Sequence, residues 1–464
     1  MVEGNAVRVL RNASENYPAW LEAIGAARRR ICFENYIIAD DDTGRLFAER
    51  LVERARAGVT VRLLYDWMGG LGERTRRLCA RMAASGVEVR CFNPPHLDRP
   101  LGWLSRDHRK SIVVDGSIAY VSGLCVSDRW AADPRRGRPE WRDTGIELLG
   151  PAVADVEHAF ASAWAAAGPP LAVTDVASRN ALVAAGAVPV RVVATEPSQA
   201  GLFRLDLLLS ALARRSLWLA DAYFLATAPY VEALRAAARD GVDVRLLVPG
   251  ASDLPVVSAL SRAGYRPLLE AGVRVFEWNG AMMHAKTAVA DGRWGRVGSS
   301  NSNMSSWLAN YELDVMMEDT EIAGVMERSY LDDLGGATEV VLRRRHVASA
   351  TPHPPRPSLQ GRAGRATASA IRLGHTVGAA LTGRRPLGPA EARVTAIAGV
   401  VLALGAVVSV TWPRLLAVPV AVVAWWFGVG LLARAVRLAR TARLEETEGE
   451  RGEDAANPSG PPRT

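Results

Sequence analysis

The chain repeats itself, and this internal duplication limits its fold more than any other feature of the sequence. ARRRICFENYII at 27–38 is echoed by ARRSLWLADAYF at 213–224, and GVTVRLLYD at 58–66 is echoed by GVDVRLLVPG at 241–250. A third pair is SGVEVRCFN and AGVRVFEWN, which begin at Ser85 and Ala271. The starts of these pairs are offset by 186, 183 and 186 residues. A chain of 464 residues therefore holds two copies of one unit, which predicts two similar lobes in a pseudo-twofold arrangement.

Each copy alternates helical patterns with short apolar strands. In the first copy we expect helices near 18–29, 44–57 and 72–85, and strands at 31–38, 59–65 and 87–92. Gly58, Gly86, Gly241 and Gly272 stand where helices should end. Such alternation is typical of an α/β fold, with helices covering a sheet in each lobe. A twofold relation would bring equivalent sites of the two lobes together.

Lysine is rare in this chain. Lys and Arg together number 56, but only two of them are lysines, and both stand in one repeated pattern. The pattern is His-x-Lys-x4-Asp, which occurs as His108, Lys110 and Asp115 and again as His284, Lys286 and Asp291. Arginine is a wide planar fork, whereas lysine is a compact point charge. Two copies at equivalent points of a duplication indicate a shared functional site, whereas a single copy would more often be a structural histidine.

The pattern suits chemistry at phosphorus. A His and a Lys at i and i+2 of a strand point to the same face. A neutral imidazole can act as nucleophile or base, while the ammonium beside it holds an anionic oxygen. If the two pairs face one another, one His can attack phosphorus and the other can protonate the leaving alcohol. Because no carboxylate cluster accompanies them, we expect the lysines to take the place of a metal, with no cofactor.

These residues resemble the phospholipase D superfamily, whose duplicated motif is HxK(x)4D(x)6GSxxN. The resemblance runs over about 5–345, and the strings WRDTGIELLGPAV from Trp141, GSSN from Gly298 and NYELDV from Asn310 look like the cardiolipin synthase branch. It implies two α/β lobes with the site at their interface. It also implies phosphodiester exchange through a phosphohistidine intermediate without a metal.

The resemblance also suggests roles for single residues. It implies His108 as nucleophile and His284 as general acid, with the reverse assignment open. The predicted catalytic set is His108, Lys110, Asp115, His284, Lys286 and Asp291, in which the lysines bind phosphate and the aspartates give structural and electrostatic support. The predicted supporting set is Ser299, Asn301, Glu312 and Asp143, of which the two carboxylates would orient histidine rings. The chain departs from the family at Cys125, where Asn is frequent, and at Asn303 and Ser305, which leaves the effect on substrate choice open.

The end of the chain changes character. We expect lobes at 1–168 and 188–346 joined by a connection at 169–187, then a linker rich in Pro, Ala and Arg at 347–390, a transmembrane hairpin at 391–436 and a basic-then-acidic disordered tail at 437–464. The hairpin has two uncharged stretches of 20 and 19 residues, long enough to cross a hydrocarbon core. A buried core hairpin and a re-entrant hairpin are the alternatives. Arginines flank both of its ends, so the positive-inside rule puts the lobes on the cytoplasmic side of the cell membrane.

The sequence thus favours a membrane-tethered phosphatidyltransferase acting on phospholipids such as phosphatidylglycerol. A hydrolytic phospholipase D would differ only in using water as the acceptor. A nuclease or other phosphodiesterase of the superfamily is a further alternative, but the net charge of +7 is modest and we expect no nucleic-acid partner. The intact His and Lys in both copies argue against an inactive scaffold. The oligomeric state is not predicted.

Overall fold

The computed structural model describes residues 1–95, 104–133 and 137–342, with a few helical residues between 411 and 429. Residues 1–94 and 102–342 form one compact unit that holds both copies. The predicted linker and tail lie outside the described residues, as does nearly all of the predicted hairpin. Among the helices that are described, none has the length and apolar character that crossing a membrane requires.

The first copy is built from alternating strands and helices. Its elements are β1 (Val2–Arg11), α1 (Asn12–Ala26), β2 (Arg30–Asn35), α2 (Asp42–Arg56), β3 (Thr60–Asp66), α3 (Glu73–Ala84), β4 (Glu88–Phe92), β5 (Lys110–Val114), β6 (Ile118–Ser122), β7 (Thr144–Leu149) and α4 (Val153–Ala166). Two short 3-10 helices, η3 (Val173–Asp175) and η4 (Arg179–Ala181), follow before the second copy.

The second copy repeats this order with two additions. Its elements are β8 (Val188–Thr195), α5 (Gly201–Leu212), β9 (Ser216–Ala220), α6 (Ala228–Arg239), β10 (Asp243–Pro249), α7 (Pro255–Glu270), β11 (Arg274–Trp278), β12 (Thr287–Ala290), β13 (Trp294–Gly298), α8 (Met304–Leu308), β14 (Glu312–Glu318), α9 (Thr320–Gly335) and β15 (Ala337–Val340). The short helix α8 and the edge strand β15 have no counterpart among the described elements of the first copy.

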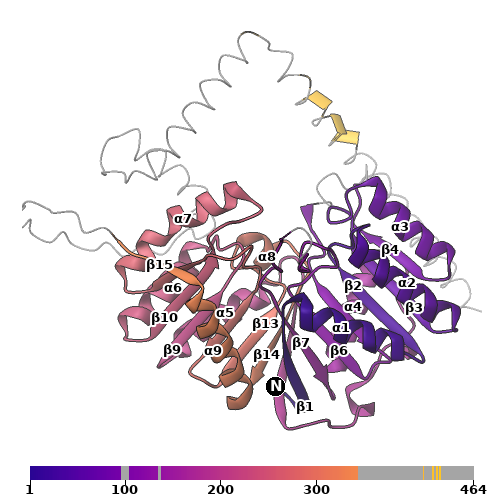
Figure 1. Cartoon of the computed structure of the whole chain (residues 1–464), viewed down its shortest axis with the longest axis horizontal. Coiled ribbons are helices and arrows are strands. Elements are labelled where there is room, and N and C mark those ends of the chain that lie inside the picture. Colours follow the sequence, from indigo (N-terminus) through magenta and orange to yellow (C-terminus); the bar gives the residue numbers. More distant parts are fainter. Residues whose placement is uncertain are drawn as a thin grey trace, which may run out of the picture. The chain divides into compact units, whose positions relative to one another are not determined.

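The strands form one sheet that runs through both lobes. Its order is β15-β11-β10-β9-β12-β13-β14-β8-β1-β7-β6-β5-β2-β3-β4. Apart from β15, the order on one side of the central β8–β1 pair repeats the order on the other. The two halves are therefore related by a pseudo-twofold axis at that pair, and Figure 1 shows the lobes on either side of it.

Strand direction places both His-x-Lys motifs at one end of the sheet. In the first lobe β2, β3 and β4 are parallel, and β5 runs antiparallel to β2 with Lys110 opposite Asn35. In the second lobe β12 runs antiparallel to β9 with Thr287 opposite Ala220. Each motif therefore begins where the parallel strands of its lobe end. Active sites of open α/β sheets lie at such carboxyl ends.

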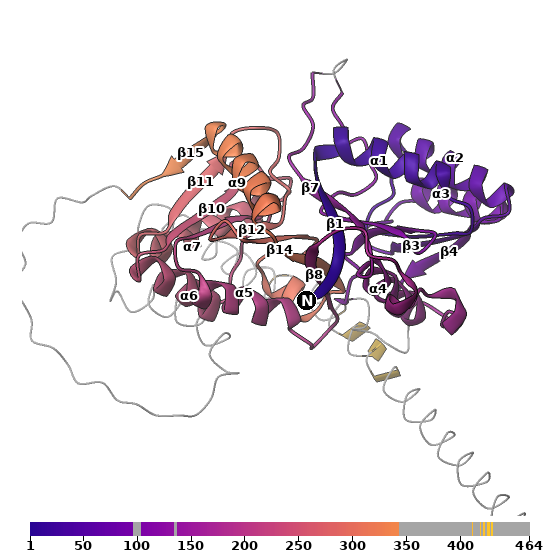
Figure 2. The same ribbon diagram turned by 90° about the horizontal axis from the view of Figure 1, so that it is seen from below.

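Each lobe has its own hydrophobic core, and a further core joins the two lobes. Helices α1, α2 and α3 cover one face of the first lobe, and α5, α6 and α7 cover the equivalent face of the second (Figure 2). A third core joins the lobes, because Phe160 and Trp164 of α4 belong to the same buried cluster as Leu313 of β14 and Met326 of α9. Burial of this common core fixes the lobes against each other, which a site made from both lobes requires.

The predicted elements of the first copy are present, with shifted ends. Helix α1 begins six residues before the predicted start, although Pro18 lies inside it. The buried Ala13 and Tyr17 pack into the first core from this early turn, and their burial outweighs the backbone hydrogen bond lost at the proline. The four predicted helix-ending glycines have φ angles of 88°, 98°, 92° and 96°, which confirms their place after α2, α3, α6 and α7.

The motif aspartates lie away from the histidines. Asp115 follows the far end of β5, where its carboxylate accepts the backbone N–H groups of Arg28, Arg29 and Arg30 at 2.9, 2.7 and 2.9 Å. Asp291 binds the N–H groups at the start of β9 in the same way. Both residues have positive φ, which Asp and Asn tolerate. The two aspartates thus occupy a supporting position, in which they hold the beginnings of β2 and β9.

Replacing Asp115 with Asn tests this structural role. Asn keeps the backbone conformation but lacks the charge and half of the acceptors, so Asp115→Asn should lower the free energy of unfolding by about 1–2 kcal/mol after allowance for partial exposure. Urea unfolding of the full chain in detergent, followed by circular dichroism, would measure the change. The matched control is Asp240→Asn at an exposed helix end, which should have little effect. Equal stability of Asp115→Asn and the parent chain would contradict the role.

Candidate active site

Reciprocal backbone hydrogen bonds bring the two motifs to the lobe interface. The His108 N–H donates to Tyr311 O at 2.9 Å, and the Tyr311 N–H donates to Arg106 O at 2.8 Å. On the other side the His284 N–H donates to Arg142 O at 2.7 Å, and the Arg142 N–H donates to Met282 O at 2.8 Å. Each histidine-bearing segment is thus paired with a segment of the other lobe. Both histidines stand just before a strand rather than within it.

The carboxylates cross between the lobes. His108 Nδ1 lies 3.1 and 3.0 Å from the two carboxylate oxygens of Glu312, which belongs to the second lobe. His284 Nδ1 lies 2.7 Å from Oδ2 of Asp143, which belongs to the first lobe. Both carboxylates are completely buried. Each of these two pairs takes its histidine from one lobe and its carboxylate from the other, so the arrangement exists only when the lobes are joined. A carboxylate on Nδ1 directs the other ring nitrogen, Nε2, toward a reacting group.

The two lysines are buried beside the histidines. Lys110 and Lys286 are 2% and 1% exposed, and each ammonium donates to the backbone carbonyl of the histidine in its own motif. The Lys286 ammonium also lies 3.1 Å from Nε2 of His284. Burial, reinforced by the positive charge of Lys110, lowers the pKa of Lys286 to about 8. The carboxylates of Asp143 and Asp221 raise the pKa of Lys286, but burial outweighs them.

Burial also keeps both imidazoles neutral. It lowers the pKa of His108 below its ordinary value, although Glu312 opposes the effect, and it lowers the pKa of His284 to about 4. The charge of Lys286 acts on His108 and the charge of Lys110 acts on His284, so both motifs share one electrostatic environment. Neutral imidazole has the free electron pair that a nucleophile or base needs.

Of the predicted supporting residues, Ser299 contacts the Glu312 side chain. Ser299 Oγ donates to the Glu312 carboxylate at 2.5 Å and accepts the Leu313 N–H at 3.0 Å. The side-chain oxygen of Asn301 is buried and has no hydrogen-bond partner among the described residues. Asn303 caps α8 by accepting the Ser306 N–H at 3.0 Å, and its amide donates to the backbone carbonyl of Tyr223 at 3.2 Å. This departure from the family motif therefore anchors a residue of the site wall.

Cys125 stands where the second lobe has Asn301. Its thiol is buried, which raises its pKa, while the charges of both Lys110 and Lys286 act to lower it. The thiol is therefore near both ammonium groups. Because a thiol is a weak hydrogen-bond donor and acceptor, this half of the site lacks the stronger amide group that Asn301 supplies in the other half.

Aromatic rings surround the two histidines unequally. The ring of His284 contacts Trp130 and Trp141, with centroids 5.2 and 5.7 Å away, and Tyr223 at 5.9 Å. His108 has Tyr36 at 5.0 Å. The Trp130 indole N–H also donates to Asp143 at 3.1 Å. Sequence reasoning missed both tryptophans, although Trp141 opens the WRD string that contains Asp143.

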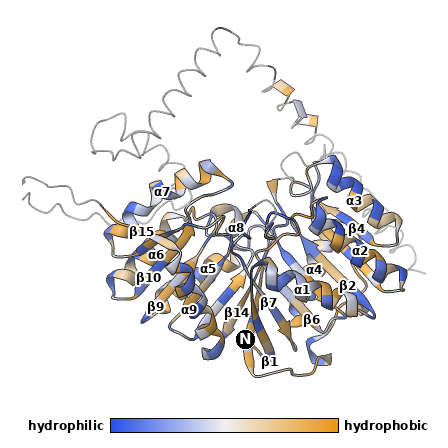
Figure 3. Cartoon of the chain, in the orientation of Figure 1, coloured by the Kyte–Doolittle hydropathy of each residue, from blue (hydrophilic) through white to orange (hydrophobic). Residues whose placement is uncertain are grey.

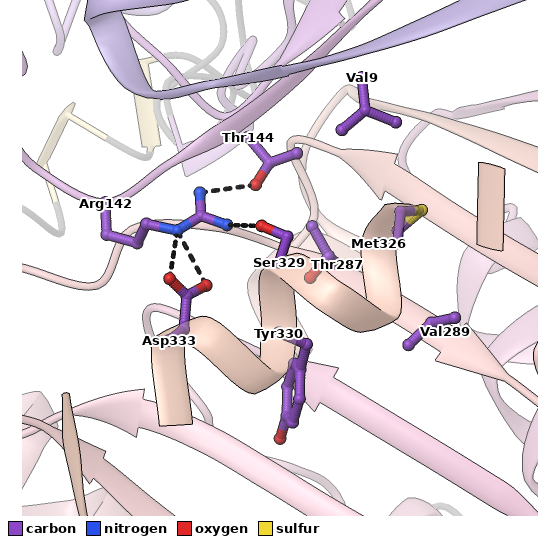
Figure 4. A pocket seen from close by; sticks show the side chains of 9 residues that line it. All are labelled: Val9, Arg142, Thr144, Thr287, Val289, Met326, Ser329, Tyr330 and Asp333. Carbon is purple, nitrogen blue, oxygen red and sulfur yellow. Dashed lines mark hydrogen bonds and ion pairs between the residues drawn. The ribbon is translucent and has the colours of Figure 1, made fainter. Parts of the chain in front are cut away.

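A buried arginine, also missed from the sequence, fixes the segment that carries Asp143. Arg142 pairs with Asp333 of α9 at 2.8 Å and donates to Ser329 at 3.0 Å and to Thr144 at 2.9 Å. Figure 4 shows these bonds around a cavity of about 20 Å³, which is too small for a substrate. Because Asp333 and Ser329 belong to the second lobe, this network ties the first-lobe strand β7 to α9 and sets the position of Asp143.

The chain matches the family model described as "Cardiolipin synthase, PLD-like domain" over 20–131 and 208–333, one segment in each lobe. It is 32% identical over 338 residues to a cardiolipin synthase of Geobacillus kaustophilus and 32% identical over 340 residues to one of Geobacillus sp. strain WCH70, in each case over 72% of this chain. The matches span 66% and 67% of those relatives.

Solved structures of lower identity share the fold. The phosphatidylserine synthase of Haemophilus influenzae superposes with a TM-score of 0.58 and 14% identity over 72% of this chain and 87% of that one. The polyphosphate kinase of Porphyromonas gingivalis gives a TM-score of 0.51 and 15% identity over 72% of this chain and 48% of that one. Since the family model covers just over half of the 464 residues and the curated relatives match across both lobes, this chain belongs to the cardiolipin synthase family with phospholipase D-like domains.

Proposed function

We propose that this chain is a phosphatidyltransferase that joins two phospholipids into cardiolipin through a phosphohistidine intermediate. The observation that carries the proposal is the pair of crossed His–carboxylate contacts, with one buried lysine beside each histidine. The similarity to curated cardiolipin synthases of Geobacillus supports a phosphatidyl group as the transferred unit. We also propose that residues 391–436 tether the lobes to the cytoplasmic side of the cell membrane.

The reaction divides into two displacements at phosphorus. In the first, His108 Nε2 attacks, a P–N bond forms, the P–O bond to glycerol breaks, and His284 gives its proton to the departing oxygen. In the second, His284 takes the proton of the hydroxyl of another phosphatidylglycerol, that oxygen attacks phosphorus, and the P–N bond breaks. The number of phosphodiester bonds is unchanged, so no external energy source is needed.

The charges of the site suit these steps. A neutral His108 can attack at once. His284 must carry a proton to act as acid, and the bound phosphodiester favours that proton. The negative charge of the phosphodiester offsets the neighbouring ammonium and raises the pKa of His284 from about 4. Lys110 and Lys286 neutralise the non-bridging oxygens, where charge develops in the transition state. Water as the acceptor would turn the same steps into phospholipase D hydrolysis.

The product distinguishes transfer from hydrolysis. Purified full-length protein in detergent, given labelled phosphatidylglycerol, should form cardiolipin and glycerol in equal amounts, measured by thin-layer chromatography and an enzymatic glycerol assay. Release of phosphatidic acid with no cardiolipin would overturn the transferase proposal and leave the hydrolase in its place. Cleavage of oligonucleotides without action on lipid would support the nuclease alternative.

Separate duties for the histidines predict separable defects. His108→Ala and His284→Ala should each lower turnover of phosphatidylglycerol by about 10²–10⁴-fold. A phosphatidyl p-nitrophenyl ester needs no acid for its leaving group, so His284→Ala should still release one equivalent of nitrophenol and become labelled, whereas His108→Ala should not. Because the carboxylates cross, Asp143→Asn should behave like His284→Ala and Glu312→Gln like His108→Ala. The opposite labelling pattern would reverse the roles of the two histidines.

The lowered pKa of Lys286 predicts the alkaline limit of the reaction. A lysine with lowered pKa loses its charge at a lower pH than usual, so kcat/KM should fall as the pH rises through about 8. The measurement is kcat/KM for detergent-dispersed phosphatidylglycerol from pH 5 to 10. In Lys286→Arg any remaining activity should lose this alkaline limb, because arginine stays charged. A constant kcat/KM up to pH 9.5 in the parent chain would contradict the assignment.

A further inference from the structure

We propose that the rim of the site docks on an anionic phospholipid bilayer, with the first turns of α7 inserted among the lipids. This inference rests on the proposed function in one respect, since that function makes the substrate a bilayer lipid. The surface is part of the lobes and is separate from the predicted hairpin. We call the segment 254–260 the apolar tip, and it reads LPVVSAL.

The apolar tip exposes side chains that a water-facing helix end rarely carries. Leu254, Val256 and Leu260 are 47%, 73% and 47% exposed. The first turn of α7 has no acidic residue, although the positive end of the helix dipole favours one there. A continuous exposed apolar group of this kind marks an interaction site. Transfer of leucine and valine side chains at a helix end from water to the acyl boundary of a bilayer is favourable.

The apolar tip lies close to His284. It follows the carboxyl end of β10, at the edge of the sheet where the motifs lie. Asp253, the residue before the tip, accepts a 2.7 Å hydrogen bond from the Tyr223 hydroxyl, and the ring of Tyr223 packs on His284. One side chain therefore separates the tip from the catalytic centre.

A cavity lies beside the tip and extends to Trp141. Its volume is about 550 Å³, and its lining includes Leu254 of the tip, Arg129, Arg138 and Trp141. Trp141 is the residue whose ring packs on His284. Two carboxylates also line the cavity, Asp128 and Asp253, and each already accepts a hydrogen bond from the protein. One cavity beside the tip is therefore lined by apolar and by cationic side chains, which suits a molecule that is apolar at one end and anionic at the other.

The equivalent helix of the first lobe is basic. Helix α3 corresponds to α7 under the pseudo-twofold axis, and both lie on the upper side of the molecule in Figure 1. Its exposed arginines are Arg74, Arg76, Arg77 and Arg81, and Figure 3 shows this helix largely blue. Leu71, just before α3, is 60% exposed. Cationic side chains beside inserted apolar ones are the pattern that binds anionic lipid headgroups.

A bilayer fits this surface better than a protein partner. The basic helix and the apolar tip flank the mouth of a site whose substrates lie in the membrane, so a protein that covered both would block entry. A bilayer in the same place supplies the substrate. The acidic headgroup of phosphatidylglycerol also matches the charge of α3.

A local probe tests insertion in the full chain. Val256→Cys, labelled with an environment-sensitive nitrobenzoxadiazole dye, should brighten on phosphatidylglycerol vesicles and be quenched by nitroxide lipids. The matched control is Val183→Cys. Val183 is 85% exposed and lies at the other end of the lobes, because the nearby Ala185 N–H donates to Gly4 O in β1. From Gly4 to the site end of β1 is roughly 23 Å at about 3.3 Å per residue. Both variants share the native cysteines, so their difference reports position.

A charge substitution tests the consequence for turnover. Val256→Asp should lower, by about tenfold, the ratio of the rate on phosphatidylglycerol vesicles to the rate on short-chain phosphatidylglycerol below its critical micelle concentration. Val183→Asp should keep the parent ratio. Thermal melting of both variants would show that the exposed substitutions leave the fold intact.

The outcomes separate this proposal from the proposed function. Quenching at Val256 but not at Val183 supports docking, even if no cardiolipin is formed, in which case only the proposed function fails. Cardiolipin synthesis with no quenching at Val256 overturns docking while the function stands. Unchanged activity ratios in Val256→Asp also overturn it. Concentration-dependent pairing of the chain through Val256 without lipid would assign the surface to a second copy and overturn the bilayer proposal.

Discussion

The crossed contact between each histidine and a carboxylate of the other lobe is the constraint on which the site depends. Glu312 and Asp143 are fully buried charges, and burial opposes their ionisation. Their histidine and lysine neighbours favour the charged form strongly enough that both pKa values lie below the ordinary range. Each carboxylate meets its histidine only where the two lobes are joined. Assembly of the site and assembly of the lobes are therefore one event.

The shared core makes that crossing possible. The central β8–β1 pair and the cluster around α4 and α9 leave little freedom between the lobes. Arg142 reinforces the joint, since its bonds to Asp333 and Ser329 hold the strand that carries Asp143. Positions within a catalytic pair must be kept to a fraction of an ångström for proton transfer. In this duplicated fold, one kind of backbone pairing between the lobes occurs twice and positions each of the two histidines.

Much of this organisation could be predicted from the sequence because it depends on local pattern. Short stretches of the chain are enough to show the duplication, the alternation of helices and strands, and the glycines after the helices. The histidines and lysines were identified because each stands in a repeated motif. The crossing of the carboxylates could not be predicted, because Asp143 precedes its histidine by more than a hundred residues. The residues around Asp143 and around His284 do not indicate which carboxylate binds which histidine. Asp115 lies at the opposite end of β5 from His108, because the motif joins residues at both ends of one strand.

The two halves of the site differ in ways that suit them to different tasks. Two equal half-sites would give two equivalent histidines, whereas attack on phosphorus and protonation of the leaving oxygen are different tasks. Trp130 and Trp141 bury His284 more completely than Tyr36 buries His108, and Cys125 stands in one half where the other has Asn301. The same asymmetry extends to the rim, where a basic α3 faces the surroundings on one side and the apolar tip on the other. Since a lipid is itself charged at one end and apolar at the other, a duplicated protein can receive it in one orientation only after its two halves have become different.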